Sequence, residues 1–112
     1  MTPWTEINSG SDIEKIKEAS YGKPVLIFKH STTCPISSAA KDRIERNCSD
    51  LGDDVKPFFL DLLSYRNISN AIATEFAVRH ESPQVLLIKN GECVYDESHF
   101  GIRASNIKLE LA

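Results

Sequence analysis

The sequence predicts an α/β protein in which helices cover both faces of a mixed central sheet. Short apolar runs typical of strands alternate with segments whose apolar residues recur at helical spacing, in the order β-α-β-α-β-α-β-β-α. The pair Asn90-Gly91 separates the last two strand-like runs, which predicts a hairpin and an antiparallel end to the sheet. At 112 residues, the chain is expected to form a single domain over residues 1–112.

Five segments carry strand-like patterns. The second of them, Val25-Leu26-Ile27-Phe28, is a continuous apolar run, which is typical of a strand buried on both faces. The fifth follows the Asn-Gly turn and is expected to pair antiparallel with the fourth. The predicted strands cover residues 4–7, 25–28, 58–62, 85–88 and 93–95.

Four segments have apolar residues at helical spacing. Ser9 or Ser11 is expected to cap the first helix, because a serine hydroxyl can accept a hydrogen bond from a free backbone N–H group. Right-handed crossovers through these helices are expected to join the parallel strands. The predicted helices cover residues 12–19, 35 to about 48, 68–76 and 104–111.

The composition is that of an ordinary globular protein, with 41% hydrophobic and 26% charged residues. A formal net charge of -3 makes nucleic acid an unexpected partner. No apolar run approaches the ~20 residues that cross a bilayer, so no membrane association is expected. Met1–Glu6 does not resemble a signal peptide, and three cysteines are an odd number for a disulfide framework. Both observations favour a cytoplasmic protein.

Cys34 is the candidate nucleophile. It follows the strand predicted over residues 25–28 and directly precedes Pro35, which suits the first position of a helix. A helix N-terminus has unpaired N–H groups and a partial positive charge, and both favour a thiolate over a thiol. The thiolate can attack a disulfide sulfur through a mixed disulfide, so we place Cys34 and Pro35 in the candidate catalytic group. A buried, inert cysteine is the alternative.

Ser37 stands three residues after Cys34, where a two-cysteine redox motif would have its second cysteine. It is expected to lie near Cys34 on the first helical turn, where its hydroxyl and N–H groups are candidate donors to the thiolate. An ordinary polar residue of the first turn is the alternative, with equal weight. Without a second thiol at this position, a mixed disulfide on Cys34 must be released by a thiol from outside the protein.

Two polar residues, Lys29 and His30, end the predicted strand. A cation or a base near Cys34 would favour the thiolate further. Lys29 is either such a cation or a solvated strand end. For His30 we favour a structural role in packing the loop over a catalytic role.

The other two cysteines are expected to be structural. Cys48 lies fourteen residues beyond Cys34 on the same predicted helix, roughly 21 Å away at a rise of ~1.5 Å per residue. A disulfide needs Cα atoms within about 7 Å, so Cys48 cannot resolve Cys34 while that helix is intact. Cys93 follows the hairpin turn, at the expected edge of the sheet and away from the helix N-terminus.

Two motifs carry a family resemblance. The segment Lys29-His30-Ser31-Thr32-Thr33-Cys34-Pro35-Ile36-Ser37, together with His80-Glu81-Ser82-Pro83-Gln84, resembles the monothiol bacilliredoxins, which have a thioredoxin-like fold. These are small cytoplasmic proteins of Gram-positive bacteria that make bacillithiol. The resemblance implies a disulfide oxidoreductase that removes bacillithiol from S-bacillithiolated client proteins. It also implies that Pro83 is a cis proline facing Cys34, and that Ser82 offers backbone groups to an extended substrate.

Bacillithiol combines a cysteine with a sugar and a dicarboxylate, so its binding site is expected to include a cation or a cluster of N–H groups. Arg79 and His80 are the best-placed candidates, immediately before the proline loop, with Arg66 and Lys41 as weaker ones. Thr33 is either a donor to the substrate or an exposed loop residue. We expect a monomer with no bound metal or cofactor, which uses bacillithiol as a co-substrate.

Two other functions fit the same cysteine. A lone cysteine at a helix start can ligate an iron–sulfur cluster across a dimer with a small thiol, which would make the protein a cluster carrier. That hypothesis predicts a brown dimer after anaerobic purification, although the bulky Pro35-Ile36 pair crowds the space a cluster needs. The other alternative is a redox-inert interaction module, in which Cys34 would titrate as an ordinary thiol.

Overall fold

The computed structural model describes residues 4–31, 33–46 and 55–111 and confirms the α/β architecture and the order of elements. The strands are β1 (Thr5–Glu6), β2 (Val25–His30), β3 (Lys56–Asp61), β4 (Gln84–Lys89) and β5 (Glu92–Ser98). The helices are α1 (Ser11–Ala19), α2 (Pro35–Arg46), α4 (Arg66–Glu75) and α5 (Ala104–Leu111), with a short 3-10 helix, η1, over His99–Gly101. None of the helices in these described ranges is long and apolar enough to cross a membrane.

The sheet has the strand order β1-β3-β2-β4-β5, with β2 in the middle. Strands β1, β3 and β2 run parallel, whereas β4 is antiparallel to β2 and β5 is antiparallel to β4. All six residues of β2 are buried, as the continuous apolar run predicts for its first four. The strand that leads to Cys34 is therefore held by neighbours on both edges and both faces.

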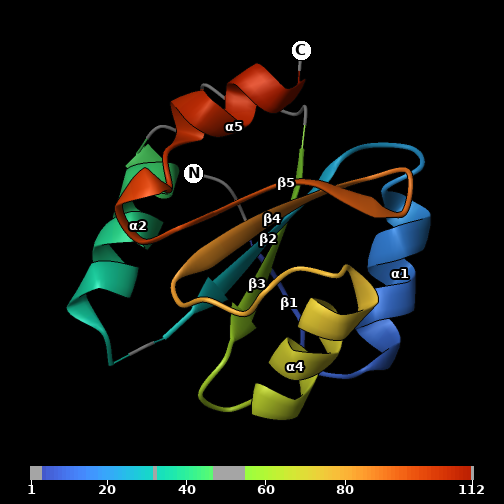
Figure 1. The fold of residues 1–112 in the computed structure, drawn as a ribbon, viewed down its shortest axis with the longest axis horizontal. Helices are drawn as coiled ribbons and strands as arrows, with labels where there is room; N and C mark the ends of the chain where they lie inside the picture. Colours follow the sequence, from blue (N-terminus) through green and yellow to red (C-terminus); the bar gives the residue numbers. More distant parts are fainter. Residues whose placement is uncertain (1–3, 32, 47–54, 112) are drawn as a thin grey trace.

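Helices cover both faces of this sheet, with α1 and α4 on one side and α2 and α5 on the other (Figure 1). Because side chains alternate along a strand, β2 sends Val25 and Ile27 into one core and Leu26 and Phe28 into the other. The first core also contains Ile13, Ile16, Ile68 and Ile72 from α1 and α4. The second contains Ala40, Ile44 and Ile107 from α2 and α5. The same alternation places Lys29 and His30, the two polar residues that end β2, on opposite faces of the sheet.

The start of α1 agrees in part with the expectation. The N-cap position is Gly10, which has no side chain, but the Ser9 hydroxyl accepts a hydrogen bond from the Ser11 N–H at 3.2 Å. In addition, the Asp12 carboxylate accepts hydrogen bonds from the N–H groups of Asn8 and Ser9, at 3.0 and 3.2 Å. A carboxylate in the first turn also complements the positive end of the helix dipole, which a serine hydroxyl would not.

The predicted hairpin joins β4 and β5. Lys89 pairs with Glu92 across a two-residue turn, and both turn residues have positive φ, 55° at Asn90 and 79° at Gly91. Such angles are required by the type I′ turn that Asn-Gly favours. A side chain at Gly91 would also place its Cβ 2.8 Å from the Tyr21 hydroxyl.

Gly91→Ala is expected to lower the free energy of unfolding by about 1–2 kcal/mol, because alanine is strained at positive φ and its Cβ would press on Tyr21. Gly22→Ala is the matched control, since a Cβ there meets only Ala19 O, at 3.7 Å. Urea unfolding of both variants checks this. Equal stability of the two variants would contradict it.

Candidate active site

Cys34 lies at the entrance to α2, as the sequence predicts. Its N–H donates to the Ser31 carbonyl at 3.1 Å, and its own carbonyl accepts from the Ser38 N–H at 3.1 Å. The thiol is partly exposed, between an exposed Thr33 and an exposed Pro35 that begins the helix. The sulfur is thus presented at a helix N-terminus where it can reach a second molecule.

Ser37 turns inward from the same helical turn. Its side chain is fully buried, and its Oγ lies 2.6 Å from His30 Nδ1 and accepts the Ser31 N–H at 3.0 Å. One hydroxyl therefore ties the end of β2, the loop after it and the first turn of α2 together. This geometry favours a structural role for the hydroxyl; donation from Ser37 to the thiolate stays a prediction.

His30 occupies the core on the α2 side, as the preferred loop-packing role requires. It is 6% exposed, and its ring centroid lies 5.7 Å from that of Phe28 and 5.5 Å from that of Phe59. Burial lowers the pKa of His30 and the Lys41 charge lowers it further, while Asp61 and Glu45 act in the opposite direction. The imidazole is therefore neutral at neutral pH and serves as a hydrogen-bonding partner for Ser37.

The Ser82–Pro83 peptide bond is cis, as predicted. The β2–β4 register pairs Lys29 with Gln84, so the next step along these antiparallel strands sets His30 beside Pro83. The cis proline and the loop between β2 and α2, which carries Cys34 and is called the cysteine loop below, therefore lie at the same end of the sheet. A close approach of Pro83 and Ser82 to Cys34 stays a prediction.

Gln84 is a supporting residue that sequence analysis missed. It is 1% exposed; its Nε2 donates to the Arg79 carbonyl at 2.9 Å, and its Oε1 accepts the Glu81 N–H at 3.4 Å. The buried amide thus holds both sides of the loop that leads to Pro83. A polar residue at the start of an otherwise apolar strand is the one signal that could have indicated it.

Lys29 is fully buried. The alternative prediction that it is a solvated residue at the end of the strand is therefore wrong. Its side chain points to the face opposite His30, where Nζ donates to the Ser69 carbonyl at 3.3 Å and lies 3.4 Å from His80 Nδ1. Ser69 Oγ also lies 3.3 Å from His80 Nδ1. Lys29 therefore joins the central strand to α4 and to the loop before Pro83.

The remaining candidate cations have different surroundings. Lys41 donates to Glu45 at 3.1 Å and lies 5.9 Å from the Phe59 ring centroid, so its charge is already partnered. The side chain of Arg79 is exposed. Arg66 and His80, in contrast, line one small cleft. Binding of substrate by Thr33, Arg79 and His80 stays a prediction, and Thr32 lies outside the described residues.

Residues 5–107 match the family described as monothiol bacilliredoxin BrxC. The chain belongs to the monothiol bacilliredoxin family. The matched residues include both motifs, residues 29–37 around Cys34 and residues 80–84 around Pro83.

Solved structures show the thioredoxin fold of the chain. A structure described as an oxidoreductase with a thioredoxin fold is 33% identical, with a TM-score of 0.81 over 94% of this chain and 90% of that chain. Thioredoxins from Malassezia sympodialis and Fasciola hepatica show the fold at TM-scores of 0.73 and 0.69, with 19% and 15% identity. The alignments cover 99% and 96% of this chain and 90% and 95% of theirs. This bacilliredoxin-family chain is a thiol oxidoreductase with a thioredoxin fold.

Cys93 lies on the edge strand β5, as expected, and its surroundings disfavour the thiolate. Its Sγ donates to the Tyr95 carbonyl at 3.3 Å, and burial raises its pKa to about 11. At neutral pH the thiolate that would attack a disulfide is almost absent. Cys48, the other cysteine predicted to be structural, lies outside the described residues.

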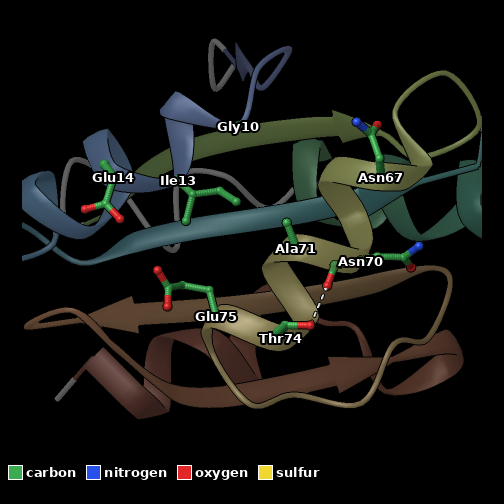
Figure 2. Close-up of a pocket in the computed structure, with 8 residues that line it drawn as sticks. All are labelled: Gly10, Ile13, Glu14, Asn67, Asn70, Ala71, Thr74 and Glu75. Atoms are coloured by element: carbon green, nitrogen blue, oxygen red, sulfur yellow. Dashed lines mark hydrogen bonds between the residues drawn. The ribbon is translucent and has the colours of Figure 1, made fainter.

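A separate groove of about 470 Å³ runs between α1 and α4 (Figure 2). It is lined by polar residues such as Glu14, Asn67 and Thr74, and the Thr74 hydroxyl donates to the Asn70 carbonyl at 3.1 Å. Its lining contains none of the candidate catalytic residues of this family member. Among the residues that the structure describes, no group of three His, Cys, Asp or Glu side chains is arranged to hold a metal ion.

Ser37→Ala is expected to lower the free energy of unfolding by about 1–3 kcal/mol, because it leaves the Ser31 N–H and His30 Nδ1 without their shared partner. Ser38→Ala, on the exposed side of the same turn, is expected to change stability by less than about 0.5 kcal/mol. Thermal or urea unfolding of the pair makes the comparison. Equal losses would show that the buried hydroxyl contributes nothing specific.

Lys29 makes stability depend on pH in a defined direction. Burial lowers its pKa from 10.5 to about 8. Below pH 8 the amine is charged in both the folded and the unfolded state, so the full cost of burying the charge is present. Between pH 8 and 10.5 the folded protein loses this proton first. The contribution of Lys29 to the free energy of unfolding therefore rises with pH across that window.

Lys29→Met is expected to raise the free energy of unfolding at pH 7 by up to about 3 kcal/mol, since one pKa unit corresponds to about 1.4 kcal/mol. This advantage over the wild type should shrink as the pH approaches 10. Urea unfolding at each pH measures the difference in free energy of unfolding between the variant and the wild type. Cys93 also titrates in this range, but it is present in both proteins, so its contribution cancels. A difference that does not change with pH would contradict the prediction.

Proposed function

We propose that this protein removes bacillithiol from S-bacillithiolated client proteins by a monothiol mechanism. The observation that supports this most is the first turn of α2, where Cys34 is partly exposed and the position of a second thiol is filled by the buried Ser37 hydroxyl. That hydroxyl is already engaged by His30 and Ser31. The family membership supports bacillithiol as the transferred thiol.

In the first step, the Cys34 thiolate attacks the bacillithiol sulfur of the mixed disulfide. A new disulfide forms between Cys34 and bacillithiol, the client disulfide breaks, and the client cysteine leaves as a thiolate. Thr33, Ser82 and Pro83 form the surroundings in which we expect the disulfide to be held. Pro35 begins the helix that presents the sulfur.

In the second step, a thiol from outside the protein attacks the bacillithiol sulfur bound to Cys34. A second bacillithiol is the simplest co-substrate: bacillithiol disulfide forms, and Cys34 is released as a thiolate that is ready for another cycle. The chemistry needs reduced thiols, so we propose that the protein acts in the cytoplasm. We also propose that it acts as a monomer.

Cys34→Ser is expected to abolish release of bacillithiol from a modified client protein, because serine cannot form the mixed disulfide. Cys93→Ser and Cys48→Ser are expected to retain activity. Mass spectrometry of a bacillithiolated client incubated with each variant measures the release, and a gain of one bacillithiol on the Cys34 peptide identifies the intermediate.

Three results would contradict parts of this proposal. Activity retained by Cys34→Ser would exclude the enzymatic mechanism. Equal rates for a glutathionylated client would show that the small-thiol assignment is wrong. A brown dimer obtained by anaerobic purification would favour the cluster-carrier alternative.

A further inference from the structure

A buried ammonium group without a facing carboxylate lies on the α4 side of the sheet. The hydrogen-bond partners of Lys29 Nζ are the Ser69 carbonyl and His80 Nδ1, at 3.3 and 3.4 Å. Within the described parts of the chain, no carboxylate oxygen comes within 4.0 Å of this nitrogen. A buried charge is costly unless it is paired, so this arrangement lacks the anion that would complete it.

A small cleft of about 90 Å³ lies beside the residues that hold this ammonium group, and Lys29 itself is behind its lining. Both partners of Lys29, Ser69 and His80, line it, together with Leu62, Arg66 and Asn70. One water molecule takes ~30 Å³ in the liquid, so the cleft has room for a carboxylate group with one or two attached carbons. A whole low-molecular-weight thiol would not fit.

The charges around the cleft favour an anion. Burial lowers the pKa of His80, and the charges of Lys29 and Arg66 lower it further. Glu81 is the one acidic group that raises this pKa. Because the Lys29 ammonium can only donate, His80 Nδ1 must accept, and the neutral ring carries its proton on Nε2. Arg66 and His80 thus line the cleft, and the Lys29 ammonium lies behind His80 at 3.4 Å from its Nδ1.

We propose that the Arg66–His80 cleft binds a carboxylate group, with Lys29 as the buried charge behind it. This inference rests on the proposed function in one respect: the carboxylate we assign to the cleft is that of the dicarboxylate in the small-thiol substrate. The cleft lies at the end of β2 and β3 that also carries the cysteine loop, since Leu62 donates its N–H to the His30 carbonyl at 3.1 Å. A thiol held there by its carboxylate would extend toward that loop.

The direct test uses L-malate as a small dicarboxylate probe, in a buffer free of other carboxylates and of phosphate. Titration of the full-length wild-type protein is followed by NMR through the backbone amides of Ser69, Asn70 and His80. We expect saturable shifts centred on these residues. An absence of saturable shifts, or shifts centred elsewhere, would overturn the proposal.

Two variants and one control test the charges. Arg66→Gln and Lys29→Met are each expected to weaken malate binding by about tenfold or more, as expected for loss of a charge-assisted interaction. Lys29→Met is predicted to be the more stable protein, so its loss of binding cannot be attributed to unfolding. Arg46→Gln removes an exposed charge at the far end of α2 and should change affinity by less than twofold. Similar losses in all three would indicate a diffuse charge effect and overturn the proposal.

Exchange kinetics separate this proposal from the proposed function. With a bacillithiolated client, Arg66→Gln is expected to raise KM for the small thiol and leave kcat nearly unchanged, because Arg66 binds the thiol away from the reacting sulfur. If malate does not bind while Cys34→Ser abolishes exchange, the cleft is wrong and the function stands. If malate binds but Cys34→Ser retains exchange, the cleft stands and the function is wrong.

Discussion

The hydrogen bond between His30 and Ser37 fixes the relative position of the central strand and the cysteine helix. At 2.6 Å, it joins the last residue of β2 to the first turn of α2 across the loop that carries Cys34. The Ser31 N–H adds a third group to the same hydroxyl. Because β2 is buried along its whole length, this contact transfers the rigidity of the sheet to the loop. The thiol of Cys34 is therefore partly exposed, while hydrogen bonds hold Ser31 and Ser37 on either side of it.

The opposite face of β2 ends in a buried charge rather than a neutral contact. Lys29 orders the loop around His80 through Nζ, but the cost of burial is visible in its pKa of about 8. Replacement of buried charged groups by apolar side chains commonly stabilises a protein, so the buried charge of Lys29 counts against the stability of the fold. One strand thus supports two different polar sites, because alternate side chains of a strand face opposite layers.

The sequence was sufficient for the order of elements, because apolar periodicity and an Asn-Gly turn are local signals. The cis state of Pro83 was available only through the family resemblance. The burial of Lys29 was not predictable, since it depends on contacts with Ser69, forty residues away, which no local pattern encodes. The contact of His30 with Ser37 was missed for a related reason: it requires the exact path of the cysteine loop. The hydrogen-bond partners of Lys29 and His30 thus depend on tertiary packing, which the local sequence pattern does not encode.

The two outer strands of the sheet are poorly suited to pair with another chain. Strand β1 is only two residues long, and β5 carries Glu92, Asp96 and Glu97 along its length. Short edges and edge charges both discourage strand-to-strand association. Another polypeptide chain therefore gains little by pairing with either edge of the sheet, which leaves all five strands to pair only with one another.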